Sequence, residues 1–228
     1  MGHLFGATNL SRVIWEKDWS SVRGECAKKP RQVRTWTLHR GFLDGENDCK
    51  VLPIHQCLAS NPPLRVVRDL VKAFPSSVFC GDSKHKRLPL HVACQASAQY
   101  KVVRFLLDAA PDTAMTKDRQ GMLPLHHALS NGASYMTIAM LLDAAPRAAS
   151  SLDGRGWLPL HTVCELSLSK MVIMEVAEAF PAAVDAKNPE GKTAIDLVLE
   201  CNRADERDIV ACLKREARLY GPRTKRKN

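Results

Sequence analysis

Four stretches of the chain repeat apolar side chains at the three- and four-residue spacing of one helix face. In residues 101–110, for example, Val102, Val103, Leu106 and Leu107 recur in this way, a pattern that predicts an amphipathic helix. The equivalent stretches are residues 64–74, 136–145 and 171–180. A proline follows each of them, at 75, 111, 146 and 181, and proline cannot continue a helix. The sequence therefore predicts four amphipathic helices that end 36, 35 and 35 residues apart.

A second type of helix start precedes these stretches. The strings are LPIH at 52–55, LPLH at 88–91, 123–126 and 158–161, and the degenerate TAID at 193–196. Their first residues are 36, 35, 35 and 35 positions apart, in phase with the prolines. Proline is favoured at the first position of a helix because its missing N–H would have no partner there. Pro89, Pro124 and Pro159 are therefore predicted to begin short helices, each followed by one of the longer helices.

Turn-forming residues precede the motifs in the same phase. Five residues before each motif stand Asn47, Ser83, Asp118, Asp153 and Asn188, and the last three are followed by Gly121, Gly156 and Gly191. Short polar side chains and glycine supply the backbone conformations that tight turns need. Each period of about 35 residues is thus predicted to form a turn, a short helix, a longer helix and a returning loop.

This phased unit, with its LPLHxA strings, closely resembles the ankyrin repeat over about residues 47–221. The resemblance implies an all-α solenoid of stacked helix-turn-helix units, with short hairpin-like turns and capping helices. It divides the chain into repeats at 47–82, 83–117, 118–152, 153–187 and 188–221. Leucine replaces the family's threonine at the first motif position in four copies. Only the histidine half of the family's polar contact is kept, so we expect each histidine to bond the backbone of a neighbouring turn.

Both ends of the array need a cover with a polar outer face. Residues 1–46 are predicted as an N-terminal helical cap with an inserted loop. Trp15, Trp19, Val22 and Cys26 share one helical face there and indicate a half-repeat. The surplus residues fall at 35–48, where Trp36 and Phe42 either fold back on the array or contact a partner. At the other end, residues 205–220 are predicted as a final helix, followed by a basic tail at 222–228.

The net charge of +9 is unevenly distributed. Residues 51–213 hold seventeen basic and seventeen acidic side chains, whereas residues 214–228 hold seven basic side chains against one acidic. A nucleic-acid-binding fold usually collects its basic residues on one face, so this distribution argues against such a function for the neutral repeats. The tail is interpreted as a solvated segment, with nuclear import or an anionic contact as the alternative.

The sequence contains no motif of a catalytic, metal-binding or cofactor-binding site. Eight cysteines are spread without a CxxC pair, which favours a reducing compartment: the cytoplasm, or alternatively the nucleus. No apolar run approaches the roughly 18–20 residues of a membrane span. The motif histidines His55, His91, His126 and His161 are interpreted as structural. Stacked helices lie about 8–10 Å apart, too far for two imidazoles to share a zinc ion at about 2 Å.

The ankyrin resemblance implies a non-catalytic protein-interaction module or scaffold. In that family the turn tips and the exposed first-helix residues line a concave binding surface. Carried over by position, the partner-binding residues are Arg87, Arg119, Met122, Arg155, Trp157 and Lys192. We expect Trp157 to be exposed beside arginine, as in a binding hot spot; the alternative is that it covers a neighbouring turn.

These residues favour a protein partner whose acidic segment carries one or two apolar anchors. Two alternatives remain open at the level of the sequence. One is an accessory protein that contacts nucleic acid or an anionic surface through the basic tail. The other is a structural subunit of a larger assembly, docked through the N-terminal tryptophans and the 35–48 loop.

Overall fold

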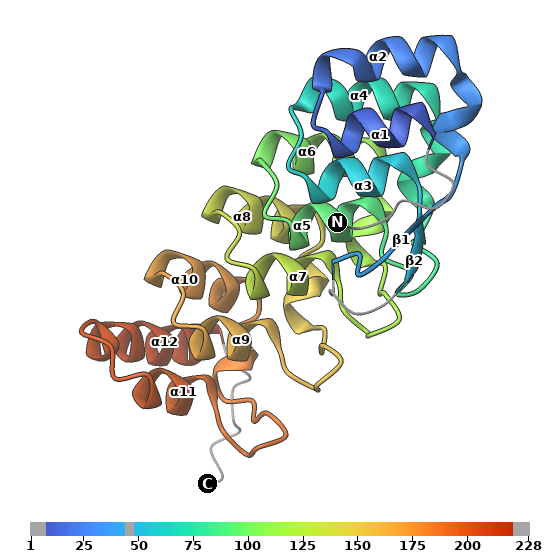
Figure 1. The fold of residues 1–228 in the computed structure, drawn as a ribbon. Helices are drawn as coiled ribbons and strands as arrows, with labels where there is room; N and C mark the ends of the chain where they lie inside the picture. The colour runs from blue at the N-terminus through green and yellow to red at the C-terminus, as the bar shows by residue number, and fades with distance from the viewer. Residues whose placement is uncertain (1–7, 44–47, 221–228) are drawn as a thin grey trace, which may run out of the picture.

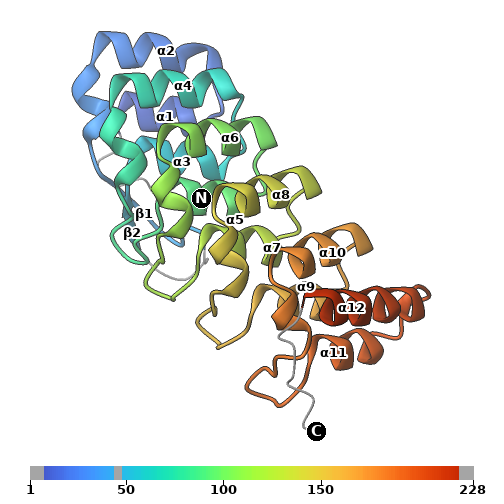
Figure 2. The same cartoon turned by 180° about the vertical axis from the view of Figure 1, so that it is seen from behind.

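A computed structural model describes residues 8–43 and 48–220 as a row of stacked helix pairs (Figure 1). The pairs are α1 (Asn9–Trp15) with α2 (Trp19–Lys28), α3 (Pro53–Ala59) with α4 (Leu64–Ala73), α5 (Pro89–Gln95) with α6 (Tyr100–Ala109), α7 (Pro124–Ser130) with α8 (Tyr135–Ala144), α9 (Pro159–Glu165) with α10 (Lys170–Ala179), and α11 (Ala194–Glu200) with α12 (Glu206–Tyr220). The odd-numbered helices form one layer and the even-numbered helices the other, as both views show (Figures 1 and 2). The fold is therefore an all-α solenoid, as predicted.

The prolines act at both ends of each helix pair. Proline occupies the first turn of α3, α5, α7 and α9, where no donor is lost. The residue before the proline that follows each longer helix leaves the helical region; Ala110, for example, has φ −155° and ψ 74°. Each of these prolines then begins a short 3₁₀ helix. The 3₁₀ helices are Pro30–Arg34, Pro75–Phe79, Pro111–Met115, Pro146–Ser150 and Pro181–Val184.

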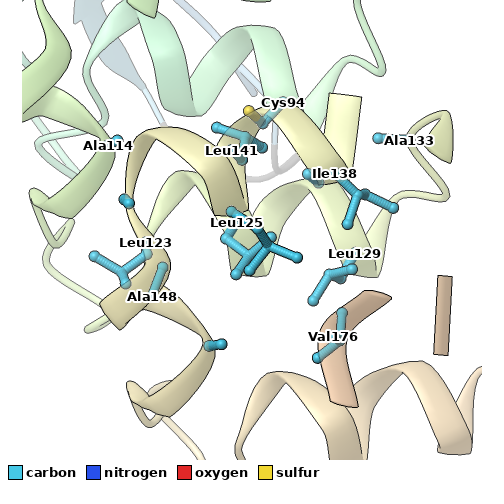
Figure 3. Close-up of a cluster of buried hydrophobic side chains, with 14 of the residues drawn as sticks. Cys94, Ala114, Leu123, Leu125, Leu129, Ala133, Ile138, Leu141, Ala148 and Val176 are labelled. Carbon is cyan, nitrogen blue, oxygen red and sulfur yellow. The ribbon is translucent and has the colours of Figure 1, made fainter. Parts of the chain in front are cut away.

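The core is a continuous apolar layer between neighbouring pairs. Figure 3 shows its centre, where Leu125 of α7 lies among side chains from the preceding and following pairs, such as Cys94 and Val176. Leu90, Leu125 and Leu160 occupy equivalent positions in successive repeats and are all buried. Since each pair buries its leucines against its neighbours, no pair has a complete core of its own.

The N-terminal cap is a complete helix pair, not the predicted half-repeat. The helical conformation is interrupted at Lys17, which has φ +56°. Helix α2 then begins after Asp18, whose carboxylate accepts a hydrogen bond from Ser21 N at 3.3 Å. Trp15 ends α1 with 55% of its surface exposed, so it does not belong to the apolar face predicted for it. Leu10, Ile14 and Val22 form the buried face, packed against residues of α3 and α4.

The predicted inserted loop is a β-hairpin. Strands β1 (Thr37–His39) and β2 (Cys49–Val51) pair antiparallel, with Leu38 opposite Lys50. The aromatic side chains of this segment fold back on the array: Phe42 packs against the apolar core, and the Trp36 ring, which is 42% exposed, lies 6.3 Å from the His55 ring. Asn47 and the basic tail at 222–228 lie outside the described residues.

A truncation in the central repeat tests this architecture. Leu125→Ala truncates a side chain of α7 that is 1% exposed and packs against the helix pairs on either side. We expect the substitution to lower the free energy of unfolding by about 2–5 kcal/mol. The matched control is Leu199→Ala in α11, where the leucine is 51% exposed and the expected loss is within about 0.5 kcal/mol. Urea denaturation measures both, and equal losses would contradict the stacked core.

Candidate interaction surface

Three of the four motif histidines join the start of an inner helix to the chain that leaves the outer helix; the exception is His91, whose Nε2 is buried without a hydrogen-bond partner among the described residues. In every LPxH motif the leucine N–H donates to histidine Nδ1, at 3.2, 3.2, 2.9 and 3.2 Å along the chain. The ring proton is therefore on Nε2, which points to a carbonyl oxygen 25 residues later: Cys80 for His55 (2.9 Å), Ser151 for His126 (3.0 Å) and Ala186 for His161 (2.9 Å). The predicted histidine-to-backbone bond is confirmed for these three residues.

Successive loops project from one edge of the stack, on the same side as the β1–β2 hairpin (Figures 1 and 2). We call these loops the fingers; they are residues 82–88, 117–123, 152–158 and 187–193. A buried Asp or Asn organises each finger by accepting backbone N–H groups. Asp118 Oδ1, for instance, accepts from Gln120 N at 2.8 Å and from Met122 N at 2.9 Å. Asp153 and Asn188 repeat this pattern, so the fingers are fixed turns.

In the first of these fingers the turn residue is Asp82, not the predicted Ser83. Asp82 accepts from Lys84 N, His85 N and Arg87 N at 2.9, 2.7 and 3.1 Å. Asp82 stands six residues before its motif, whereas Asp118, Asp153 and Asn188 stand five residues before theirs, and this extra residue accounts for the longer period of 36. Lys86 takes the positive φ (+58°) that glycine supplies in the later fingers.

Adjacent fingers lie in contact. Arg119 N donates to His85 O at 2.8 Å, and Arg119 Nη1 donates to Lys84 O at 2.9 Å, across one finger boundary. At the next boundary a Cβ on Gly154 would collide with the carbonyl oxygen of Gln120, so this position requires glycine. The fingers therefore form one continuous surface.

A hollow of about 570 Å³ lies between the second and third fingers. Its lining residues are Arg119, Gln120, Met122, Gly154 and Arg155. Three of them, Arg119, Met122 and Arg155, belong to the predicted partner-binding set, and the structure brings them together. Met122 is half-buried at the base, whereas Arg119 and Arg155 are exposed. The hollow, which we call the finger hollow, thus combines an apolar base with two cationic sides.

A family model identifies part of this array. The model for ankyrin repeats matches residues 54–150 in three copies, a range that holds the helix pairs from α3 to α8 and the first two fingers. Residues 54–150 of the chain are therefore ankyrin repeats. Among curated proteins, none matches the chain. Ankyrin repeats in general are protein-interaction modules, and the family is typically non-enzymatic.

Trp157 is not the exposed anchor that the sequence suggested. Only 4% of its surface is exposed in this array. Its ring lies edge-on to the His161 ring at 6.1 Å, and the Arg155 guanidinium covers it at 4.6 Å. The Trp157 side chain points inward, so Trp157 supports its finger and holds Arg155 above it by a cation–π contact.

Arg87 is also buried, with 5% of its surface exposed. Its Nη2 donates to Gln120 Oε1 at 2.7 Å, and its Nε lies 3.5 Å from Asp118 Oδ2. His127 Nε2 bonds the same carboxylate oxygen at 2.9 Å. Burial by itself raises the pKa of Asp118, but the bonds from His127 and the finger backbone outweigh it and lower that pKa to about 2. Arg87 therefore holds the base of the second finger and is not exposed on the surface.

The sixth predicted residue, Lys192, lies in the last finger, away from the hollow. Its Nζ pairs with Glu200 at 2.8 Å and Glu190 at 3.7 Å. Sequence reasoning missed the Arg87–Asp118–His127 cluster, although the doubled histidine at 126–127 was a signal: the second ring breaks the repeat pattern and needs its own polar partner.

Within residues 8–43 and 48–220, no group of three or more His, Cys, Asp or Glu side chains could hold a metal ion. Across the same ranges, no helix is both long and apolar enough to cross a membrane. The cysteines in the core, such as Cys57 and Cys94, have pKa values raised by burial and are poor nucleophiles.

The buried histidines predict a pH dependence of stability. Burial lowers the pKa of His55 and of His91 to about 4, whereas histidine in an unfolded chain has a pKa of about 6.5. Between these values the unfolded chain takes up protons that the folded protein refuses, so the free energy of unfolding should fall as the pH drops from about 6.5 toward 4.

Urea denaturation across this range measures the loss, and NMR titration of the rings assigns it. We expect the His55 and His91 resonances to show neutral rings at pH 5.5. Histidine rings that titrate near pH 6.5 in the folded protein would contradict the prediction that His55 and His91 are buried as neutral rings. A free energy of unfolding that does not change between pH 4.5 and 7 would contradict it as well.

Proposed function

We propose that this protein is a non-catalytic scaffold that binds a protein partner through its fingers, with the finger hollow as the central contact. The observation that carries the proposal is the convergence of Arg119, Met122 and Arg155 on one hollow between two rigid fingers. A preordered surface avoids the cost of ordering loops on binding. The proposed role is therefore rigid display, in which the partner alone adapts.

The chemistry of the hollow favours an acidic segment with an apolar anchor. Met122 offers a polarisable apolar base that adapts to different side chains. Arg155 is held over Trp157, with its side chain 54% exposed, near Asp153 and Glu165 at 3.2 and 3.7 Å. An incoming carboxylate can replace the exposed Glu165 without moving the guanidinium. Arg119 is fixed from behind by Lys84 O, so both cations are already positioned.

We propose a reducing compartment, the cytoplasm, with the nucleus as the alternative. The eight cysteines are free, and two of those in the core are buried beside apolar side chains.

Arg87 and Trp157 support the proposed surface from beneath, and Lys192 belongs to its margin. Arg119, Met122 and Arg155 are left as the residues that contact the partner.

Selection from a displayed library of random peptides tests the proposal. Peptides recovered on the intact protein should contain acidic residues around a large apolar side chain. For these peptides, Arg155→Glu should raise the Kd, measured by fluorescence anisotropy, by about tenfold or more, because it replaces an attractive charge by a repulsive one. Met122→Ala should raise the Kd by a smaller factor.

Arg147→Glu is the matched control, since Arg147 is exposed in the 3₁₀ helix Pro146–Ser150 and outside the hollow. It should leave the Kd within about twofold, as a distant surface charge does at moderate salt. All variants should keep the wild-type melting temperature within a few degrees. Recovery of no peptide whose affinity depends on Arg155 would contradict the proposed site.

A further inference from the structure

The outer helical layer is strongly basic at its N-terminal half. Residues 19–34, 64–73 and 100–109, which hold α2, α4, α6 and the first 3₁₀ helix, carry ten Lys and Arg side chains against three Asp and Glu. All ten basic side chains are exposed. In α8 and α10, by contrast, one lysine stands against three acidic residues. The neutral total of residues 51–213 therefore conceals half of this basic face, and residues 19–34 supply the other half.

A second hollow lies in this basic face, between α2 and α4. It measures about 530 Å³, and its lining includes Trp19, Arg23, Leu64, Arg65, Arg68 and Asp69. The two helices lie side by side in both views (Figures 1 and 2). Trp19 and Leu64 are half-buried and give the hollow an apolar wall. The hollow, which we call the α2–α4 hollow, shares no lining residue with the finger hollow.

The cationic side chains around the α2–α4 hollow differ in how firmly they are held. The Arg23 side chain is 81% exposed and lies 3.4 Å from Asp69. The Arg68 guanidinium lies over the Phe105 ring of α6, 5.8 Å from the ring centroid. Arg65 is exposed on the same helix, three residues before Arg68. Arginine beside tryptophan is the composition that is enriched at the energetic centres of protein interfaces.

We propose that the α2–α4 hollow docks a second protein partner, through an acidic peptide segment that inserts one large apolar side chain between Trp19 and Leu64. The surrounding arginines then pair with carboxylates that flank this anchor. A hollow with an apolar wall and a cationic rim suits this mode of recognition. The carboxylate of Asp69, which also lines the hollow, would repel the densely charged phosphate backbone of a nucleic acid. This repulsion favours a peptide as the ligand.

The consequence is a scaffold with two docking surfaces on different parts of the solenoid. One lies on the fingers, and the other lies on the outer layer near the N-terminus. Because the stack holds both on one rigid body, the two partners would be brought to a fixed separation. The outer site does not depend on the finger site, so either can fail a test alone.

The experiment uses the same displayed library of random peptides on the intact protein. Peptides that bind the outer site should be rich in Asp and Glu around one aromatic or leucine residue. Arg65→Glu should raise their Kd by about tenfold or more, whereas Arg65→Lys should keep most of the affinity, because it preserves the charge. Arg155→Glu, which disables the finger hollow, should leave the Kd of these peptides unchanged.

Lys214→Glu is the matched control, because it makes the same charge reversal at an exposed position of α12, at the far end of the outer layer. It should leave binding unchanged. Trp19→Ala removes part of the apolar wall and should weaken binding, and its melting temperature checks that the N-terminal helix pair remains folded. If this variant is destabilised, Arg23→Gln replaces it as the test. Arg23→Gln leaves the apolar wall intact and should weaken binding.

Three results would overturn the proposal. One is that no recovered peptide depends on Arg65. Another is that Lys214→Glu weakens binding as much as Arg65→Glu, which would indicate a general charge effect. The last is that duplex RNA or phosphatidylserine vesicles bind in an Arg65-dependent manner while no peptide does. The first result would leave the finger site standing if peptides dependent on Arg155 are still recovered.

Discussion

Burial of apolar surface between neighbouring helix pairs is the constraint on which the rest of this structure depends. A pair of a seven-residue and a ten-residue helix, such as α7 with α8, is too small to enclose a core of its own. Leu125 is covered only because pairs stand on both sides of it. The stack therefore holds each pair in place, and every element that follows takes its position from the spacing of the stack.

The fingers and their hollow inherit that position through polar links. Three of the four motif histidines tie the start of the inner helix to the loop that leaves the outer helix, and a neutral imidazole can do so because it has one acceptor and one donor nitrogen. The Asp and Asn residues then shape each finger, and Gly154 allows adjacent fingers to touch. The geometry at Met122 and Arg155 is thus a consequence of core packing, transmitted by hydrogen bonds.

The repeat itself could be predicted from the sequence because each of its signals is local. Proline at a helix start, proline after a helix and an apolar stripe act within a few residues, so the predicted helices agree with the observed ones to within about a residue (compare 101–110 with Tyr100–Ala109). Asp82 was missed because one inserted residue places it six residues before its motif, and the prediction took the residue five before. The break at Lys17 was missed because a positive φ at lysine leaves no clear mark in the sequence.

The direction of a side chain at the finger base depended on tertiary structure and could not be read from position alone. Met122, Trp157 and Arg87 occupy the same place before the motif, but Met122 borders a hollow while the other two are buried. Trp157 turned inward onto His161, and Arg87 turned toward Asp118 and His127 of the next repeat. The α2–α4 hollow was equally hidden, because its residues come from helices about 45 positions apart.

Native-state hydrogen exchange, resolved by residue, tests most directly the claim that each helix pair is stabilised by its neighbours. Amides in α5, α7 and α9, which have a pair on either side, should exchange most slowly, and those in α11 and α12 at the end of the stack should exchange faster. Protection that is highest in α11 and α12, or equal along the whole array, would contradict the account.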